Sequence, residues 1–481
     1  MTLFLRGRDA MPGSREQKTN KAWEDQYRQM VLTPVDKLIT RLAVPTVVSM
    51  MISMIYNLAD AYFVGKLGTS ASASIGVVMS LHTLFQAIGF MHGHGSGSLI
   101  SRKLGSFDRE AAVKYASIGF YGSLLMSLCL ALPGLLFMDS LVRVMGSTET
   151  MAPYAKEYAF YILLSGPILA ASCVLNNILR YEGKAFYAMI GLVSGGILNI
   201  IGDPLCIFVL DMGIRGAGLA TALSQYISFF ILLFMFRSNK TISKISLRTF
   251  LRRFSPGEYG FTLKNGLPSL SRQCLNAFSA IAMNLTAAPY GDAAIAAMTI
   301  AGRIMMFIGA AMIGIGQGLQ PVAAYNYGAG KYSRIRTGFV FTWKLGEVVM
   351  GILALLCFFF PADLIRFFRD DPEVIRIGIR ALRFQCPAAL LQPVSVVANM
   401  CFQSMGLAGS ALFLSALRSG LCYIPIILVL PRFIGLAGIE SAQLVADLLT
   451  LAVTLPFLFR FFRRLRGKED EHHKMDKLAE G

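Results

Sequence analysis

The chain has 481 residues, of which 55% are hydrophobic and only 15% charged, and its formal net charge is +17. Soluble domains carry about 25% charged residues, so this composition excludes an ordinary soluble protein. Apolar runs that reach the roughly 20 residues needed to cross a bilayer recur from about residue 38 to residue 462. We therefore expect an all-α integral membrane protein without a large soluble domain.

The first segment, residues 1–37, is polar and lacks the pattern of a secretory signal, which predicts a cytoplasmic leader. Residues 463–481 form a basic stretch that we expect to be a cytoplasmic tail. Between these two segments the apolar runs predict twelve spans. They lie near residues 38–65, 72–97, 111–137, 153–178, 184–211, 215–237, 261–288, 293–318, 334–360, 375–403, 406–431 and 436–462.

Lys and Arg side chains are concentrated in the leader, the tail and every second connection between the spans. Cytoplasmic loops carry this excess of positive charge, so both termini are expected in the cytoplasm. The basic balance therefore indicates orientation, and no nucleic-acid partner is expected. The eight cysteines form no close pair, so neither disulfides nor a zinc site is predicted.

The two halves of the chain are similar to each other when they are shifted by 223 residues. Glycines at 68, 93, 95, 105 and 183 then fall on glycines at 291, 316, 318, 328 and 406, and Asn176 falls on Asn399. The shift carries six spans onto six spans, which predicts two lobes with the same orientation, residues 38–237 and 261–462, joined by a cytoplasmic linker at 238–260. Such parallel repeats place a substrate site between the lobes near the bilayer midplane.

Polar residues recur at helical spacing in the first lobe. Ser53, Tyr56, Asn57 and Asp60 form one stripe in the first span, where Pro45 is expected to bend the helix. The fourth span carries Tyr158 and Tyr161, the fifth carries Asn199 and Asp203 four residues apart, and the sixth carries Thr221 and Gln225. Since polar groups are costly in lipid, these faces are predicted to line a cavity.

Asp60 and Asp203 are the only carboxylates expected deep in the membrane within the first lobe. A charged Asp at the centre of a membrane helix costs about 2.5–3.5 kcal/mol on insertion scales. Two such acids beside Asn, Tyr and Thr side chains can share a proton or bind Na⁺ through their oxygens. The alternative is structural: each Asp would cap a broken helix or tie two helices together.

The second lobe has mostly neutral stripes, which include Asn276 in the seventh span and Gln392 and Asn399 in the tenth. Arg418 and Asp447 are expected to form a structural ion pair, so ion coupling is assigned to the first lobe. His92 and His94 point to different sides of a helix and predict close packing rather than a metal site. No catalytic or nucleotide-binding motif is present, and an enzyme is not expected.

Several motifs together resemble the multidrug and toxic compound extrusion (MATE) transporters, in particular the bacterial MepA- and DinF-like branch. They are "LAVPTVVSMMISMIYNLADAYFVGKLG", "LNIIGDPLCIF", the pair "GHGSGSLISRKLG" and "GQGLQPVAAYNYGAG", and "IRGAGLATALSQ". The resemblance covers roughly residues 34–462 and implies a multi-pass protein of a bacterial cytoplasmic (inner) membrane. It implies twelve transmembrane helices in two six-helix lobes, related by a pseudo-two-fold axis along the membrane normal and arranged as a V.

The resemblance also implies roles for individual residues. Asp60, Asp203, Asn199, Tyr158 and Thr221 would form the ion-coupling site of the first lobe. Pro45 would bend the first helix. The residues expected to line the substrate cavity are Tyr56, Asn57, Tyr161, Gln225, Asn276, Gln392 and Asn399. Other members carry acids in the seventh and tenth helices that this chain lacks, so a sodium site in the second lobe is not expected.

The expected function is export of small-molecule drugs or toxic metabolites by alternating access, driven by antiport of H⁺ or Na⁺. The substrates are expected to be amphipathic and often cationic, the protein a monomer, and no cofactor other than the coupling ion is predicted. One alternative is a flippase of a lipid or lipid-linked precursor from the same superfamily, which should show more cationic residues in its cavity. Another is a membrane receptor or scaffold without ion coupling.

Overall fold

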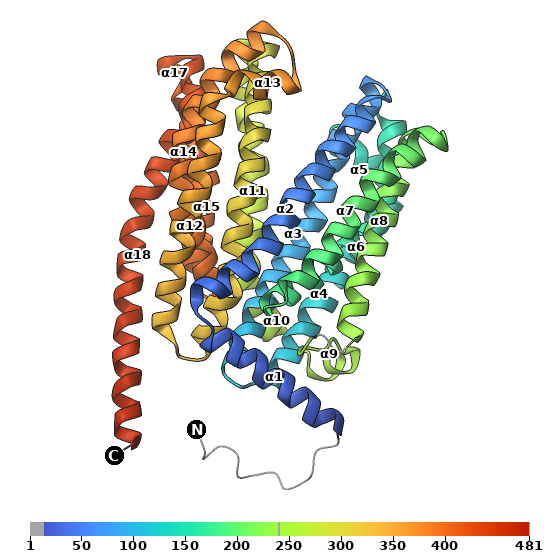
Figure 1. The fold of residues 1–481 in the computed structure, drawn as a ribbon. Helices are drawn as coiled ribbons and strands as arrows, with labels where there is room; N and C mark the ends of the chain where they lie inside the picture. Colours follow the sequence, from blue (N-terminus) through green and yellow to red (C-terminus); the bar gives the residue numbers. More distant parts are fainter. Residues whose placement is uncertain (1–13, 239–240, 481) are drawn as a thin grey trace.

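The computed structural model describes residues 14–238 and 241–480, and every regular element within them is a helix (Figure 1). In chain order the helices are α1 (Ser14–Leu32), α2 (Val35–Gly65), α3 (Thr69–Gly105), α4 (Arg109–Leu136), α5 (Met138–Val144), α6 (Ala152–Tyr181), α7 (Ala185–Pro204), η1 (Leu205–Val209), α8 (Gly213–Arg237), α9 (Leu247–Arg253), α10 (Pro256–Ala287), η2 (Ala288–Tyr290), α11 (Asp292–Gly328), α12 (Tyr332–Phe359), α13 (Pro361–Phe368), α14 (Pro372–Ser404), α15 (Ala408–Ala416), η3 (Leu417–Cys422), α16 (Tyr423–Val429), α17 (Pro431–Ile434) and α18 (Leu436–Glu480).

Ten helical segments in the described residues are long and apolar enough to cross a membrane. Helices α10 and α14 are equally long, at 32 and 33 residues, but carry more polar side chains. With these two, the described chain has twelve spanning units, the eleventh being the run of α15, η3 and α16. The all-α membrane fold expected from the sequence is confirmed.

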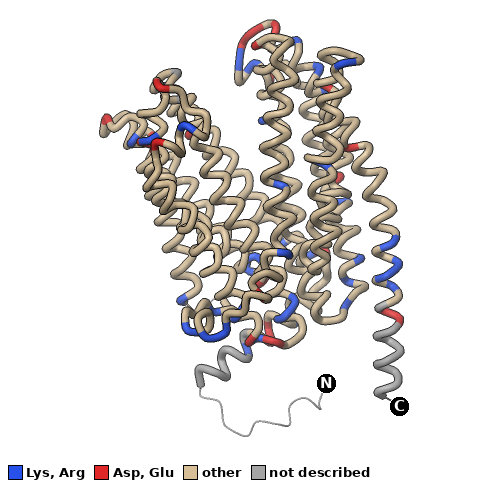
Figure 2. The backbone as a smooth tube through the Cα atoms, turned by 180° about the vertical axis from the view of Figure 1, so that it is seen from behind, with Lys and Arg blue, Asp and Glu red and all other residues tan. Residues whose placement is uncertain are grey.

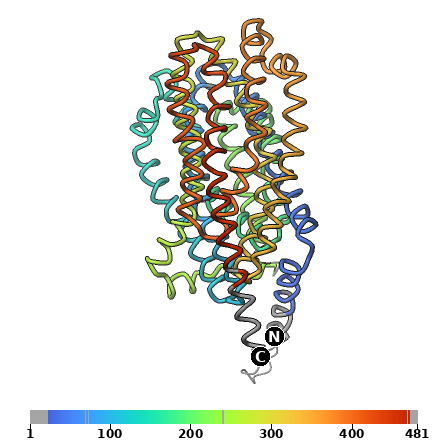
Figure 3. The backbone as a smooth tube through the Cα atoms, turned by 90° about the vertical axis from the view of Figure 1, so that its left-hand side faces the viewer, coloured from blue at the N-terminus to red at the C-terminus, as the bar shows by residue number. Residues whose placement is uncertain are grey.

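The spanning units form two lobes, α2–α8 and α10–α18 (Figure 1). The lobes diverge toward the end that carries α5, α13 and α17, which we call the open end. They converge toward the end that carries α1 and α9, and Figures 1 and 3 show that the C-terminal part of α18 lies at the same end, where the described chain begins and ends. We call this the terminal end. The arrangement is the predicted V of two six-helix lobes.

The internal repeat is visible in individual contacts. The side-chain amide of Asn176 donates to the carbonyl oxygen of Ala188 at 2.8 Å, and that of Asn399 donates to the carbonyl oxygen of Ala411 at 2.6 Å. Asn399 and Ala411 lie 223 positions after Asn176 and Ala188, respectively. Gly68 and Gly291 begin equivalent helices at φ of 112° and 89°, a conformation that glycine adopts without steric cost.

The lobes meet through direct contact of helix backbones. A β-carbon added to Gly266 of α10 would lie 1.8 Å from the carbonyl oxygen of Met91 in α3, and one added to Gly328 of α11 would lie 2.0 Å from the carbonyl oxygen of Arg102 in α3. Only glycine permits so close an approach. The three helices therefore hold the lobes together toward the terminal end.

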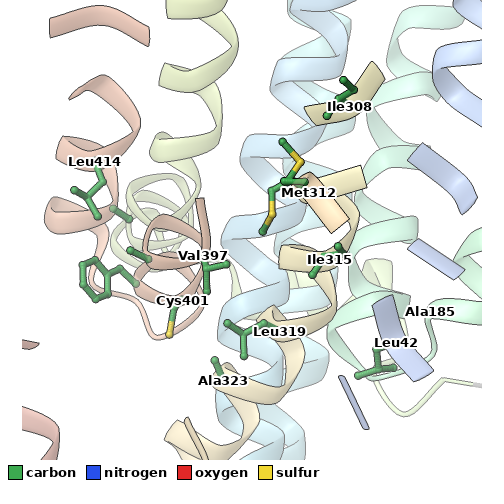
Figure 4. Packing of buried hydrophobic residues seen from close by; sticks show 14 of the residues in the cluster. Leu42, Ala185, Ile308, Met312, Ile315, Leu319, Ala323, Val397, Cys401 and Leu414 are labelled. Atoms are coloured by element: carbon green, nitrogen blue, oxygen red, sulfur yellow. The ribbon is translucent and has the colours of Figure 1, made fainter. Parts of the chain in front are cut away.

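Apolar side chains extend this contact along α11. Ile308, Met312, Ile315, Leu319 and Ala323 follow one another along the helix and belong to one buried cluster (Figure 4). The same cluster includes residues of α2 from the first lobe, among them the leucine at position 42. The core of the molecule is thus shared by both lobes, and not confined to each lobe separately.

Charged residues gather at the two ends of the molecule, with largely uncharged helices between them (Figure 2). At the terminal end, Gln26 of α1 donates to the carbonyl oxygen of Glu182, and the Glu182 carboxylate accepts from the backbone nitrogens of Ile242 at 3.0 Å and Ser243 at 2.7 Å. The side-chain amide of Asn326 in α11 donates to the carbonyl oxygen of Met30 in α1 at 3.1 Å, so the described part of the expected leader, residues 14–32, contains a helix that contacts both lobes. Residues 1–13 lie outside the described residues. The linker contains α9, and α10 begins at Pro256.

We predict that Gly266→Ala destabilises the protein by about 1–3 kcal/mol, because the added methyl group has no room against the α3 backbone. Thermal unfolding of the detergent-purified protein measures the effect. Gly260→Ala on the same helix is the control, since nothing lies within 4 Å of its added β-carbon and alanine is favoured over glycine in helices by about 1 kcal/mol. Equal unfolding temperatures for the two variants would contradict the proposed backbone contact.

Candidate ion and substrate site

Asp60 of α2 and Asp203 of α7 meet inside the first lobe. Their side chains are 7% and 0% exposed, and the two carboxyl groups are in hydrogen-bonding contact with each other. The side-chain amide of Asn199, one turn before Asp203, donates to Asp203 at 3.2 Å and to the hydroxyl of Thr221 at 3.2 Å. The cluster therefore joins α2, α7 and α8.

Tyr158 completes the cluster, because its fully buried side chain hydrogen-bonds to Thr221. The structure thus brings together all five residues of the expected coupling site. One oxygen of each of three members, Asp60, Asp203 and Asn199, has no hydrogen-bond donor among the described residues. Buried acceptors need a donor or a cation, so these oxygens offer a position for a proton or for Na⁺, and their chemistry fits both.

The sequence left open that Asp60 and Asp203 cap broken helices. Neither acid does so in the structure. Asp60 lies in the last two turns of α2 and Asp203 in the last turn of α7, and neither side chain accepts a hydrogen bond from a helix N-terminus. Across the part of the chain that is described, no Lys or Arg forms an ion pair with either acid; Lys66 instead lies over the ring of Tyr62, 4.5 Å from its centre. Asn199 also connects α7 to α8 through its hydrogen bond to Thr221, so the cluster joins helices as well as holding the two acids.

Proline shapes both helices that carry the acids. Pro45 lies inside α2, where it removes a backbone donor and weakens the helix between Asp60 and the terminal end. Pro204 ends α7, and the chain continues as the π-helical turn η1. A π-turn widens the helix and often occurs at functional positions. The prolines thus loosen the backbone around an otherwise tightly packed cluster.

A cavity of about 250 Å³ lies beside the cluster and extends to α10 and α11 of the second lobe. Asn199 and Thr221 belong to its lining and connect it to the two acids, which do not line it themselves. Of the seven residues expected to line a substrate cavity, three do so: Tyr56, Asn57 and Gln225.

The other four expected residues do not line this cavity. Asn399 is used in packing α14 against α15, and the Asn276 side chain accepts from the hydroxyl of Ser419 at 2.7 Å. Tyr161 packs against Gly218, and Gln392 is buried within α14. A helical stripe identifies a polar face, but the packing of neighbouring helices decides whether that face meets a cavity or another helix.

Sequence reasoning missed the two arginines beside the cavity at the junction of the lobes. His94, Arg272, Gln273 and Gln317 line it there, and Arg180 lies directly behind them. Arg272 lies within the predicted span 261–288, which was the signal available in the sequence. His92 and His94 point to different sides of α3, as expected. His92 contacts the hydroxyl of Tyr259 at 3.0 Å, and His94 contacts the hydroxyl of Ser269 at 2.9 Å.

The second lobe contains the expected ion pair. The Arg418 guanidinium donates to the Asp447 carboxylate at 2.8 Å, and the Asp447 side chain is 2% exposed. The pair joins η3 to α18 and lies away from the cavity lining. Its geometry supports a structural role.

Two helical lobes around a shared cavity are the architecture of a membrane transporter. A family model described as MatE matches residues 45–205 and 268–429, more than half of the chain, and the chain belongs to that family.

Relatives with known names or structures cover nearly the whole chain. The multidrug export protein MepA of Staphylococcus aureus (strain MSSA476) is 25% identical over 447 residues, 92% of this chain and 97% of its own. MepA of Staphylococcus haemolyticus is 27% identical over 435 residues, 89% of this chain and 94% of its own. A crystal structure of MATE in the straight conformation superposes with a TM-score of 0.86 at 27% identity, covering 92% of this chain and 99% of that one.

We predict that Arg418→Met lowers the stability of the protein by about 3 kcal/mol, because it leaves the Asp447 carboxylate buried without its partner. The double variant Arg418→Met/Asp447→Leu should recover most of this loss, since it removes both charges. Thermal unfolding in detergent measures both. A double variant as unstable as the single one would show that the pair is not merely structural.

Proposed function

We propose that this protein exports amphipathic small molecules across a bacterial cytoplasmic membrane by antiport with H⁺ or Na⁺. The observation that carries the proposal is the buried contact between Asp60 and Asp203, beside a cavity shared by two lobes. The names of the relatives, multidrug export proteins, support the same function. No cofactor other than the coupling ion is required.

The distribution of charge supports an orientation with the terminal end in the cytoplasm. Lys and Arg are enriched in the segments that lie at this end, as cytoplasmic loops require. The lobes are closed there by the contacts of α3 with α10 and α11, and they diverge toward the outside. We infer that the described conformation is open to the outside, and that export requires the lobes to close there and separate at the cytoplasmic end.

Helix α2 provides the physical link between ion binding and lobe movement. Asp60 lies near one end of it, and toward the other end Ala43 and Val47 pack against Gly318 and Gly314 of α11 in the second lobe. Pro45 lies between these two contact residues. A proton or Na⁺ that binds the carboxyl pair changes its charge, and any resulting change in the path of α2 reaches the interface between the lobes.

The thermodynamic requirement for such coupling is differential affinity. An ion shifts the transporter between two states only by the difference in its affinity for them, and substrate affinity changes by a reciprocal factor. Burial in one conformation and hydration in the other gives the carboxyl pair such a difference. We propose that loading the pair from the outside lowers substrate affinity and releases the substrate.

The lining of the cavity bears on the alternatives. It contains Arg272 and no Asp or Glu, so the expectation of cationic substrates finds no acid in the lining itself, and the contrast with a flippase is weaker than the sequence implied. The buried acid pair still distinguishes a coupled transporter from a receptor or scaffold, which has no need for it.

We predict that Asp60→Asn and Asp203→Asn each reduce gradient-driven transport roughly tenfold or more, the range of a typical coupling free energy. The measurement is transport by the purified protein in liposomes under a pH gradient alone and then a Na⁺ gradient alone, which also identifies the ion. The control is Glu347→Gln, which removes a carboxylate from α12 while leaving an acceptor for the Trp343 indole, 2.8 Å away. Wild-type transport by either Asp variant would refute coupling through the pair.

A further inference from the structure

One side of the cavity is basic. Arg272 of α10 lines it beside Gln273, Gln317 and His94, and Arg180 of α6 lies immediately behind the last two. The Arg180 guanidinium donates to the side chains of Gln317 and of Asn177, the latter at 2.7 Å. Both arginines are therefore placed on the same wall, at the junction of the two lobes.

The histidine in this wall contributes no positive charge in the observed arrangement. Its Nε2 atom lies 3.4 Å from the Arg180 guanidinium, which has donors only, so Nε2 accepts. Its Nδ1 atom lies 2.9 Å from the hydroxyl of Ser269 and carries the proton. The wall therefore combines two guanidinium charges with neutral donors and acceptors.

No carboxylate balances these charges. Neither Arg180 nor Arg272 forms an ion pair within residues 14–238 and 241–480, and no acid lines the cavity. The described hydrogen-bond partners of Arg180 are all uncharged, its Nε atom has no acceptor, and Arg272 makes no hydrogen bond within the described part of the chain. An unbalanced charge is costly at membrane depth and marks a functional position by default.

The guanidinium groups of the two arginines differ in their hydrogen-bond partners and in their exposure. Arg180 is 4% exposed and bridges α6 to α11, so it also stabilises the closed junction of the lobes. Arg272 is only half-buried and faces the cavity, so its donors are accessible to a ligand. A guanidinium presents parallel donors that match the two oxygens of a carboxylate, sulfonate or phosphate group.

The rest of the lining is apolar. Met50, Met54, Phe90, Leu169 and Ile313 contribute side chains without charge or strong hydrogen-bonding groups. Methionine adapts to ligands of different shape, which suits a cavity with one fixed polar anchor. The lining thus complements a molecule with an apolar body and a single acidic group.

We propose that the cavity binds amphipathic molecules through an acidic group held by Arg272, with Arg180 adding positive charge behind it. The proposal rests on the proposed export function and names its substrate class: organic anions and zwitterions whose acidic group faces α10. A soluble organic acid and the headgroup of an anionic lipid share this chemistry, and the experiment below separates them.

The test is equilibrium binding of three fluorescent probes to the full chain in phosphatidylcholine nanodiscs. Dansylglycine, dansylglycinamide and dansylcadaverine share one apolar body and are anionic, neutral and cationic. Wild-type protein should bind dansylglycine most tightly. Arg272→Gln should weaken that binding roughly tenfold or more, as expected for the loss of a charge-assisted hydrogen bond. The same variant should leave dansylglycinamide binding unchanged, which shows that the cavity is intact.

Two further variants control for charge and for folding. Arg272→Lys should restore part of the preference for dansylglycine, because it retains the charge without the paired donors. Arg303→Gln removes an exposed arginine of α11 that does not line the cavity, and should behave as the wild type. A tighter affinity for dansylcadaverine, equal or absent binding of the anionic probe, or an Arg272→Gln variant with wild-type affinity for it would each overturn the proposal.

Nanodiscs that also contain phosphatidylglycerol distinguish the two sources of the acidic group. If this lipid competes with dansylglycine for the wild-type protein, the ligand of Arg272 is a lipid headgroup. If dansylglycine binding is unchanged, the ligand is a soluble organic acid. In either case the ligand of Arg272 is an anion. Because binding requires no ion gradient, it is independent of coupling. Loss of transport in liposomes with intact selective binding would refute the export function alone.

Discussion

The structure depends on one unfavourable placement, two carboxyl groups in direct contact where water is excluded. A hydrogen bond between carboxyl groups requires that one of them carries a proton, and two negative charges at this distance would repel each other strongly in a poorly polar environment. Asn199, Thr221 and Tyr158 surround the pair with neutral hydrogen-bonding groups but supply no positive charge. The first lobe therefore contains a site that a cation stabilises.

The position of this site within the fold gives it a mechanical consequence. Asp60 and the lobe interface lie on the same helix, α2, and the interface is closed by backbone contacts that tolerate no added methyl group. Close-packed contacts of this kind have discrete arrangements rather than a continuous range. In the proposed mechanism, a local change of charge at Asp60 therefore favours one arrangement of the lobes over another instead of spreading as a gradual deformation.

The cavity has two chemically different walls. Asn199 and Thr221 separate it from the carboxyl pair in the first lobe, whereas Arg272, Gln273 and Gln317 face it from the second lobe. The carboxyl pair and Arg272 thus belong to different lobes, which move relative to each other in the proposed mechanism. In that mechanism, a substrate that contacts both walls is held while the lobes keep their present separation and is released when they rearrange.

The sequence alone determined the twelve spans, the two-fold repeat and the residues of the carboxyl cluster, because hydropathy, glycine spacing and isolated acids are local signals. Tertiary structure decided which polar faces meet the cavity. Asn399 and Asn176 are equivalent polar residues, yet only Asn176 also lines the cavity, because the helices around Asn399 bury it within the second lobe. Arg180 and Arg272 are 92 positions apart, and only the packing of α3 against α10 and of α6 against α11 places their charges on one wall.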